Sequence, residues 1–366
     1  MRVLWLSWKD AAHPLSGGAE RIQSLLIAGL LRDGHAVTLV TARYRGALPE
    51  ETRTDGLRII RAGNRFTVYW HAYRTYRRRL RGWPDVIVDE MNTIPFFAAR
   101  YAREPVALFI HQLCREIWFY EMWFPANVIG YALEPLYLRL LRHSPAVTVS
   151  ESTKRDLIRH GFSEARIRVI PEAIGLTPCA PGGREKAEVP TVLCFGSIRP
   201  MKRTEEVIRA FEIAKREIPD LRLVIAGMPT GSYGQGIIER ANESPCAGSI
   251  DLLGPVPEPQ KGTVMGRAHV LCAASVKEGW GLTVTEAQSQ GTPAIVYDVD
   301  GLRECVGPGG AVCQANTPQS MAAEIVALLR SPARYARVRE AGIARAAAFT
   351  EEAMCAKFIE GLHACR

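Results

Sequence analysis

Short apolar runs alternate with amphipathic stretches along the first half of the chain. Runs of the length expected for a buried strand lie at residues 3–6, 36–41, 57–61, 86–88, 106–110, 146–149 and 169–170. Apolar residues with helical spacing lie between several of these runs, at residues 19–32, 129–142 and 154–160. Because a helical crossover makes the strands it joins parallel, this alternation predicts an α/β fold with a doubly wound parallel sheet.

The same alternation begins again after a stretch rich in Pro, Gly and Ala. Strands are expected at residues 191–195, 221–226, 250–253, 269–273 and 294–297, and helices at 204–217, 317–330 and 334–363. The intervening residues 171–190 break the pattern and predict an interdomain linker. We therefore expect an N-terminal domain over residues 1–170, a similar C-terminal domain over 191–345, and a C-terminal helix at 346–366 that packs back on the N-terminal domain.

Length and composition agree with two globular domains. The chain has 366 residues, of which 47% are hydrophobic. No apolar run reaches the roughly 20 residues that a membrane-spanning helix needs. The N-terminus is a short strand followed at once by charged residues, and it lacks the long apolar core of a signal peptide. We therefore expect a cytoplasmic protein.

The nine cysteines are scattered and form no C-x-x-C pair. An odd number of scattered cysteines favours free thiols in a reducing compartment over a disulfide framework. No group of His, Cys and Asp has the spacing of metal ligands, so the sequence predicts no metal site and no bound cofactor.

The net charge of +8 is concentrated in the first half of the chain. Residues 1–170 carry 25 Lys and Arg against 16 Asp and Glu, whereas the remainder carries 21 against 22. A basic surface attracts nucleic acid, anionic lipid or phosphorylated ligands, so the N-terminal half is expected to meet one of these.

The most informative loop lies between an expected strand and an expected helix. It reads VKEGWGLTVTEAQSQG over residues 276–291, with Glu278 and Gly281 on the loop, Thr283 at the helix start and Glu286 in the first turn. Unpaired amides and the positive dipole end of a helix attract phosphate, and carboxylates accept hydrogen bonds from hydroxyl groups. This pattern suits a sugar nucleotide. In the structural alternative, Thr283 and Glu286 form only a capping box.

Two further loops follow expected strands. Gly17 and Gly18 precede a helix without the G-x-G-x-x-G pattern, which disfavours NAD but still lets a ligand approach the backbone. The second loop begins at Gly196 and carries Arg199 and Lys202, which can neutralise a diphosphate at the carboxyl end of a strand. The structural alternatives are a tight turn for the first loop and a solvated basic loop for the second.

One histidine occupies a comparable position in the first half. His111 directly follows the apolar run 106–110, at the carboxyl end of an expected strand. This location favours a role in a ligand site. A hydrogen-bonded structural histidine is the alternative.

Together these motifs resemble glycosyltransferase family 4 over nearly the whole chain. The residues that carry the resemblance are 17–20, His111, 149–152, 169–171, Gly196, Lys202, 226–227, 253–254, the E-x7-E pair Glu278 and Glu286, and Gly-Thr-Pro at 291–293. The resemblance implies a GT-B fold, in which two Rossmann-like doubly wound domains face a cleft. It also implies transfer of a hexose from a nucleotide sugar, with retention of configuration and without an essential metal.

The resemblance also assigns roles to residues. Glu278 and His111 would lie beside the transferred sugar, and Glu286 would hold the ribose hydroxyls of the donor. Arg199 and Lys202 would neutralise the diphosphate and stabilise it as it leaves. The residues whose backbone would approach the donor are Gly17, Gly18, Gly196, Gly281, Leu282 and Thr283.

The chain departs from the family pattern at three positions. Ser197 stands where the family often has an arginine, and Arg199 is the candidate replacement. Glu172 lies in a loop that usually reads V-I-P-N-G, so this loop departs from the family pattern. Trp280 stands where phenylalanine is commoner, which is a mild change.

Two segments of the basic half suggest where an acceptor is met. Residues 69–81 read YWHAYRTYRRRLR and residues 117–124 read IWFYEMWF. Arginines with aromatic side chains favour contact with an anionic membrane surface, on the inner face of the membrane. A solvated helix face with an aromatic core or dimer cluster is the structural alternative. Nucleic acid is disfavoured because no RNA- or DNA-binding motif accompanies these segments.

The sequence therefore predicts a hexosyltransferase that uses a UDP- or GDP-sugar. Its acceptor is expected to be a glycan or a lipid-linked molecule, as in the synthesis of envelope polysaccharides or glycoconjugates. Two alternatives remain: a nucleotide-sugar epimerase on the same fold, and a protein that binds nucleotide sugars without turnover.

Overall fold

The chain forms two compact units. The computed structural model describes residues 1–53, 55–180 and 182–365. Unit 1 comprises Met1–Arg115, Ile129–Ala173 and Thr350–Arg366, and unit 2 comprises Glu116–Val128 and Ile174–Phe349. These boundaries differ from the expected ones in three respects. Residues 116–128 belong with unit 2, and the chain enters unit 2 at Ile174, before the end of the expected linker. Unit 2 also extends to Phe349, beyond the expected end at residue 345.

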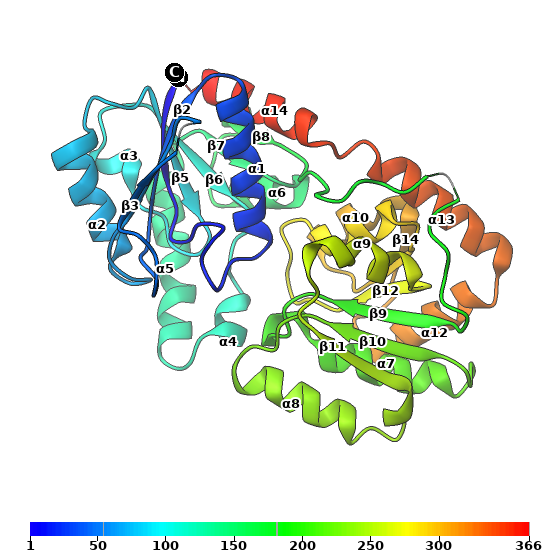
Figure 1. Ribbon diagram of the computed structural model, residues 1–366. Coiled ribbons are helices and arrows are strands. Elements are labelled where there is room, and N and C mark those ends of the chain that lie inside the picture. The colour runs from blue at the N-terminus through cyan, green and yellow to red at the C-terminus, as the bar shows by residue number, and fades with distance from the viewer. Residues whose placement is uncertain (54, 181, 366) are drawn as a thin grey trace. The chain divides into compact units, whose positions relative to one another are not determined.

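Unit 1 is built on an eight-stranded sheet with the order β3-β4-β2-β1-β5-β6-β7-β8 (Figure 1). Its strands are β1 (Arg2–Leu6), β2 (Ala36–Thr41), β3 (Glu50–Thr52), β4 (Leu57–Arg61), β5 (Val86–Met91), β6 (Val106–Ile110), β7 (Ala146–Thr148) and β8 (Ile167–Val169). The predicted parallel sheet is confirmed, except that β3 pairs antiparallel with β4 at the edge. The strand order reverses direction at β1, which marks a place where such sheets bind ligands.

Helices cover both faces of this sheet. They are α1 (Gly18–Arg32), α2 (Val68–Thr75), α3 (Ala98–Tyr101), α5 (Ala126–Leu141), α6 (Glu151–Arg159) and α14 (Glu351–His363). Side chains of successive strand residues point to opposite faces. Leu4 and Leu6 of β1 therefore pack with Val68 of α2, whereas the Trp5 ring lies 5.4 Å from the Phe358 ring of α14. This alternation explains why residues 3–6 of the first strand are all apolar.

The last helix of the chain packs against the first. A Cβ atom added at Gly29 of α1 would lie 2.4 Å from the Sγ atom of Cys355 in α14, so the two helices touch there. Arg32 at the end of α1 pairs with Glu351 at 2.7 Å. The C-terminal segment thus completes unit 1.

Unit 2 holds a second, fully parallel sheet with the order β11-β10-β9-β12-β13-β14. Its strands are β9 (Thr191–Phe195), β10 (Arg222–Ala226), β11 (Ile250–Gly254), β12 (Val270–Ala273), β13 (Ala294–Val296) and β14 (Gly310–Val312). Its helices are α4 (Ile117–Glu121), α7 (Thr204–Lys215), α8 (Gly231–Asn242), α9 (Glu258–Arg267), α10 (Leu282–Ser289), α11 (Asp300–Val306), α12 (Pro318–Leu329) and α13 (Pro332–Ala346). The strand order reverses direction between β9 and β12.

Among the described residues, no helix is both long and apolar enough to cross a membrane. All nine cysteines are free. The described residues also contain no cluster of three or more His, Cys, Asp or Glu side chains suited to a metal ion.

Candidate active site

A pocket in unit 2 lies at the carboxyl ends of β9 and β12, where the sheet order reverses. Its lining residues are Cys194, Phe195, Gly196, Ser197, Lys202, Thr204, Cys272, Ala273, Ala274, Ser275, Glu278, Thr283 and Leu302. Four of the predicted site residues are among them: Gly196, Lys202, Glu278 and Thr283. A reversal of strand order leaves a crevice between the two neighbouring connections, which is why such sheets bind ligands there.

The wall of this pocket at the end of β9 depends on two glycines. Gly196 has a φ of 134° and Gly227 a φ of 148°. Residues with a side chain rarely adopt these backbone conformations, whereas glycine adopts them readily. A Cβ atom at Gly227 would lie only 1.8 Å from the carbonyl oxygen of Gly196. The two glycines therefore let the ends of β9 and β10 approach each other, and this fixes the start of the loop that carries Lys202.

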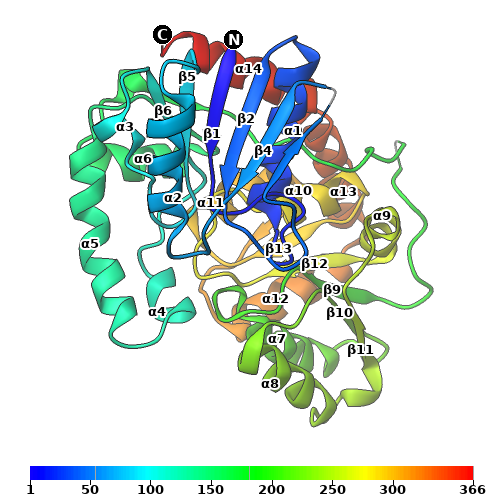
Figure 2. The ribbon, with the colours of Figure 1, turned by 60° about the vertical axis from the view of Figure 1, so that its left-hand side comes forward.

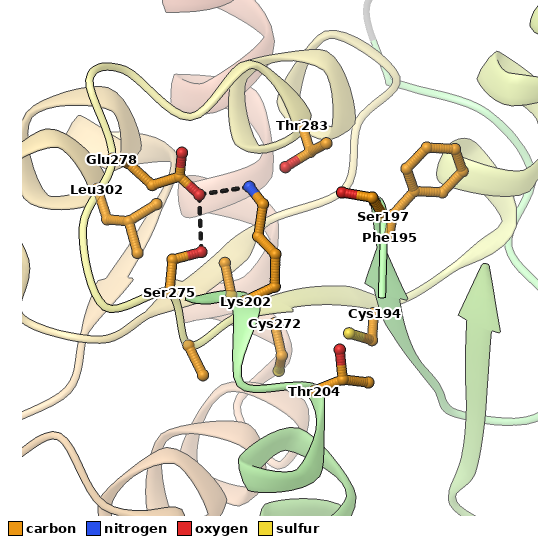
Figure 3. Close-up of a pocket in the computed structure, with 13 residues that line it drawn as sticks. Cys194, Phe195, Ser197, Lys202, Thr204, Cys272, Ser275, Glu278, Thr283 and Leu302 are labelled. Carbon is orange, nitrogen blue, oxygen red and sulfur yellow. Dashed lines mark hydrogen bonds and ion pairs between the residues drawn. The ribbon is translucent and has the colours of Figure 1, made fainter. Parts of the chain in front are cut away.

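Lys202 and Glu278 form an ion pair inside the pocket (Figure 3). The hydroxyl of Ser275, at the end of β12, donates to the same carboxylate oxygen of Glu278 at 2.7 Å. Burial alone would raise the pKa of Glu278, but the charge and hydrogen bond of Lys202 hold it below its usual range, with help from Ser275 and Arg199. A negative carboxylate and a positive amine therefore stand side by side at neutral pH.

Helix α10 begins at the edge of this pocket. Its N-cap is Gly281, with a φ of 106°, and its first intrahelical hydrogen bond runs from the Val284 N–H to the Gly281 carbonyl at 2.9 Å. Thr283 is therefore inside the helix, and the capping-box alternative for Thr283 and Glu286 is wrong because neither residue is in the required position. The amides of Leu282 and Thr283 lie before the first helical bond, where an anion can accept from them.

Helix α11 supports the loop that carries Glu278. A Cβ atom at Gly301 in α11 would lie 2.1 Å from the Glu278 carbonyl oxygen, and one at Gly281 would lie 2.8 Å from the Sγ atom of Cys305 in α11. Glycine is therefore required on both sides of this contact. The position of the Glu278 carboxylate depends on how closely α11 approaches.

Replacing Gly301 with alanine is expected to displace the Glu278 loop. Overpacking of this kind costs about 1–3 kcal/mol of unfolding free energy and should also weaken binding of ligands in the pocket. The matched control is Gly236→Ala in α8, where a Cβ atom meets nothing within 4 Å. That substitution should leave stability unchanged or raise it by about 0.5–1 kcal/mol. Urea unfolding of both variants checks the prediction, and equal effects would contradict it.

Glu286 is buried beside the pocket but does not line it. Its side chain is 1% exposed and accepts a hydrogen bond from Nζ of Lys261, in α9, at 2.6 Å. The Lys261 amine also lies 5.9 Å from the ring of Phe195, which lines the pocket. Three other predicted residues of unit 2 also lie outside the lining: Arg199, Gly281 and Leu282. Arg199 has its Nε atom 3.9 Å from a carboxylate oxygen of Glu121 in α4.

In unit 1, His111 lies between two buried carboxylates. Its Nε2 is 3.1 Å from Glu90 at the end of β5, and its Nδ1 is 3.2 Å from Glu172. The indole N–H of Trp5 donates to the other oxygen of Glu90 at 2.6 Å, and Gln23 of α1 donates to it as well. The cluster thus joins the carboxyl ends of β1, β5 and β6 to α1.

The two carboxylates determine the charge of His111. Burial alone would lower the pKa of this histidine, but the hydrogen bonds and charges of Glu172 and Glu90 outweigh burial and raise the pKa to about 10. At neutral pH, His111 is therefore an imidazolium whose two N–H groups each face a carboxylate. Glu172, the departure from the family pattern, supplies half of this charge environment.

Gly17, which precedes α1, stands at a position where the backbone does not require a glycine. Gly17 is the N-cap in extended conformation, with a φ of −147°, which any residue can adopt. A Cβ atom there would meet only Glu20, at an ordinary 3.8 Å. The Gly17 amide donates to Glu20 at 2.7 Å, and Lys9 pairs with the same oxygen at 3.1 Å. A glycine that the fold does not need leaves room for a ligand.

Two family models match the chain. The model described as Glycosyltransferase Family 4 matches residues 16–177, and the model described as Glycosyl transferases group 1 matches residues 182–345. The chain belongs to glycosyltransferase family 4. The predicted family is thereby confirmed across both units.

Relatives with known names agree with this family. The D-inositol 3-phosphate glycosyltransferase of Nocardia farcinica is 31% identical over 216 residues, which cover 55% of this chain and 48% of that protein. The protein of the same name from Mycobacterium marinum is 30% identical over 221 residues, which cover 56% of this chain and 47% of that protein. The chain thus matches about half the length of these relatives.

Solved structures match the fold over the full chain. Sucrose-phosphate synthase from Thermosynechococcus elongatus has a TM-score of 0.77 at 18% identity, with 100% of both chains covered. WaaG, a glycosyltransferase involved in lipopolysaccharide biosynthesis, has a TM-score of 0.78 at 14% identity, with 98% of this chain and 99% of that chain covered. Anabaena Alr3699/HepE in complex with UDP and glucose has a TM-score of 0.74 at 17% identity, with both chains covered fully. The predicted GT-B fold is confirmed.

Sequence reasoning missed several members of the two clusters. Ser275, which holds Glu278, and Lys261, which holds Glu286, were not predicted. Glu90 was not singled out either, and Glu172 was noted only as a departure from the family pattern. A buried strand that ends in Asp-Glu, as β5 does before Met91, was the available signal for Glu90, because a buried carboxylate needs a partner.

Proposed function

We propose that this protein transfers a hexose from a UDP- or GDP-sugar to an acceptor, with retention of configuration and without a metal. The observation that carries the proposal is the Lys202–Glu278 pair, which stands beside the N-terminus of α10 at the reversal of the unit 2 sheet. A cation and free amides suit a diphosphate, and a carboxylate suits the hydroxyls of a sugar. The complex of the related fold Alr3699/HepE with UDP-glucose supports the donor class.

In the proposed reaction, the diphosphate leaves as the acceptor oxygen attacks the anomeric carbon. Lys202 and Arg199 stabilise the negative charge that grows on the departing diphosphate, and the amides of Leu282 and Thr283 donate to it. The acceptor hydroxyl loses its proton to the leaving phosphate as the new bond forms on the same face. Glu278 orients the sugar, and Glu286 binds the ribose.

His111 has a more constrained role in this reaction. Both of its ring nitrogens face carboxylates, so a hydrogen bond to a sugar hydroxyl requires that one carboxylate is exchanged. We propose that Glu172 is the one exchanged, because Glu90 is held by Trp5 and Gln23 as well. The charged imidazolium then donates to the transferred sugar, with Gly17 and Gly18 close to the donor.

We propose an acceptor that is a glycan or is carried on a lipid, as in envelope polysaccharide or glycoconjugate synthesis. The basic excess of the N-terminal half supports an anionic or phosphate-bearing acceptor. It also supports a cytoplasmic protein that is peripheral to the inner face of the membrane.

A thermal-shift screen over UDP-, GDP-, ADP- and dTDP-sugars tests the donor proposal. A donor at saturating concentration should raise the melting temperature by roughly 2–5 °C, since a ligand that binds only the folded state stabilises it. Product analysis with the selected donor then separates the alternatives. An epimerase converts the donor without any acceptor, and a binding protein leaves it intact. No shift with any of the four donor classes at millimolar concentration would overturn the proposal.

A further inference from the structure

Helix α5 exposes an apolar face that no part of unit 1 covers. Ile129, Leu133, Leu136 and Leu140 are 53%, 50%, 62% and 46% exposed, and their spacing places them on one side of the helix. We call these four residues the α5 apolar face. Figure 2 shows α5 standing along one side of unit 1. Four large aliphatic side chains in one row are unusual on a water-exposed surface and indicate a binding partner.

The charges beside the α5 apolar face are positive. Arg139 is exposed on the last turn of the helix, and Arg142 and His143 follow the helix end. The helix has one carboxylate, Glu134, which is buried and points away from this face. A leucine row with basic residues at one end and no exposed acid matches an anionic lipid surface, in which apolar side chains enter the acyl boundary and arginines meet the phosphates.

Aromatic residues precede the same helix. Trp123 and Phe124 are 73% and 75% exposed, immediately before α5 begins at Ala126. Tryptophan is enriched at the boundary between lipid and water because its ring is apolar and its N–H is polar. The sequence singled out residues 117–124 for membrane contact, but it did not indicate the apolar residues that α5 exposes.

The buried side of α5 is fixed to the fold. Pro135 has no N–H, which frees the carbonyl of Tyr131 four residues earlier, and Arg115 donates to that carbonyl at 3.4 Å. The Glu134 carboxylate accepts from the amides of Cys114 and Arg115, at 2.7 and 2.6 Å. The helix therefore cannot rotate to bury its leucines without breaking these bonds, so the α5 apolar face is a permanent surface.

We propose that the α5 apolar face docks this protein onto an anionic lipid bilayer. A second copy of the chain is a poorer occupant. A parallel pairing through this face would bring Arg139 and Arg142 toward like charges, and in either direction the partner helix offers them no exposed acid. The inference deepens the proposed function, since a lipid-carried acceptor lies in such a surface. Docking can nevertheless be measured without donor or turnover.

The test is co-sedimentation of the full chain with vesicles. Vesicles of equal parts phosphatidylcholine and phosphatidylglycerol are compared with vesicles of phosphatidylcholine alone, at moderate salt. The unaltered protein should bind the anionic vesicles and bind the neutral ones at least about fivefold more weakly. Leu136→Glu should lower binding to anionic vesicles by about tenfold or more, because a carboxylate would have to enter the apolar boundary.

Leu48→Glu is the matched control, since Leu48 is also 62% exposed but lies outside α5, before β3. Its vesicle binding should equal that of the unaltered protein. Arg139→Gln is a second, milder variant that should weaken binding to anionic vesicles only. Circular dichroism and the donor thermal shift should be the same for all three variants and the unaltered protein.

Three outcomes would overturn the proposal. They are no binding of the unaltered protein to anionic vesicles, equal binding by the Leu136→Glu and Leu48→Glu variants, and a dimer in solution that Leu136→Glu dissociates. If the donor still raises the melting temperature in any of these cases, the proposed transfer reaction is not contradicted. If the donor no longer raises the melting temperature but the protein binds vesicles as expected, the proposed docking surface is not contradicted.

Discussion

Replacing Lys202 with alanine is expected to lower the rate of sugar transfer by roughly 10²–10³-fold, because the departing diphosphate loses a cation that stabilises its charge. The effect should appear mainly in kcat, since the charge on the leaving group grows in the transition state. Steady-state kinetics with the donor found in the thermal screen measures it. Lys357→Ala is the control, because Lys357 lies exposed on α14, and its rate should stay unchanged.

The same variant should also change the Glu278 carboxylate. Without Lys202, the buried Glu278 keeps the hydrogen bond from Ser275 but loses its largest stabilising charge, so the pKa of Glu278 should rise. Glu278→Ala should likewise reduce transfer far more than it reduces stability, because it removes the group that is proposed to orient the sugar. If Lys202→Ala retains more than about half of the original kcat, the role proposed for this lysine is wrong.

Replacing Glu172 with glutamine is expected to lower the pKa of His111 from its value of about 10, since one of the two opposing charges is removed. Breaking a buried charge pair costs on the order of 3 kcal/mol of unfolding free energy near neutral pH. The pH dependence follows from the sign of the shift. The pKa of His111 is raised on folding, so its stabilisation is fully present below pH 6.5 and is lost as pH rises through about 10.

The unfolding free energy measured between pH 6 and 10 checks this prediction. In the unaltered protein, stability from this cluster should fall across that range, and in the Glu172→Gln variant the fall should be smaller and should end at lower pH. Glu164→Gln is the control, because Glu164 is an exposed carboxylate of the same unit. Identical pH profiles for the Glu172→Gln variant and the unaltered protein would show that Glu172 does not hold the charge of His111.

The alternation of strands and helices could be predicted because most residues of the buried strands are apolar on both faces of these sheets. The run 106–110 is an example, since all five residues of β6 are buried. The short edge strand β3 could not be predicted, because its residues Glu50–Thr52 are polar and partly exposed. Local pattern identifies a strand only where burial dictates its composition.

The position of a side chain relative to the core was harder to predict. Helix α5 has apolar residues on both sides, with Leu138 and Leu141 buried and Leu136 and Leu140 exposed. Periodicity alone therefore could not say which side faces solvent. Contacts between distant segments were also out of reach, such as the support that Gly301 gives to the Glu278 loop.

The residues of the candidate pocket also include some that the sequence predicted and some that it did not. Gly196, Lys202, Glu278 and Thr283 were predicted because each follows a strand or starts a helix, and the fold brings such positions together. Ser275 and Lys261 gave no such signal, since a serine and a helical lysine are ordinary surface residues. Ser275 contacts Glu278 and Lys261 contacts Glu286 only when the chain has folded.

The ion pair inside the pocket has a consequence for the proposed catalytic cycle. In the proposed reaction, a diphosphate that binds Lys202 replaces the Glu278 carboxylate as the partner of this lysine, and the nucleotide product competes with Glu278 for the same ammonium group. Weak anions such as inorganic phosphate then gain little from the site, and product leaves as the internal partner returns. Turnover under this scheme is set by an exchange of partners around one ammonium group.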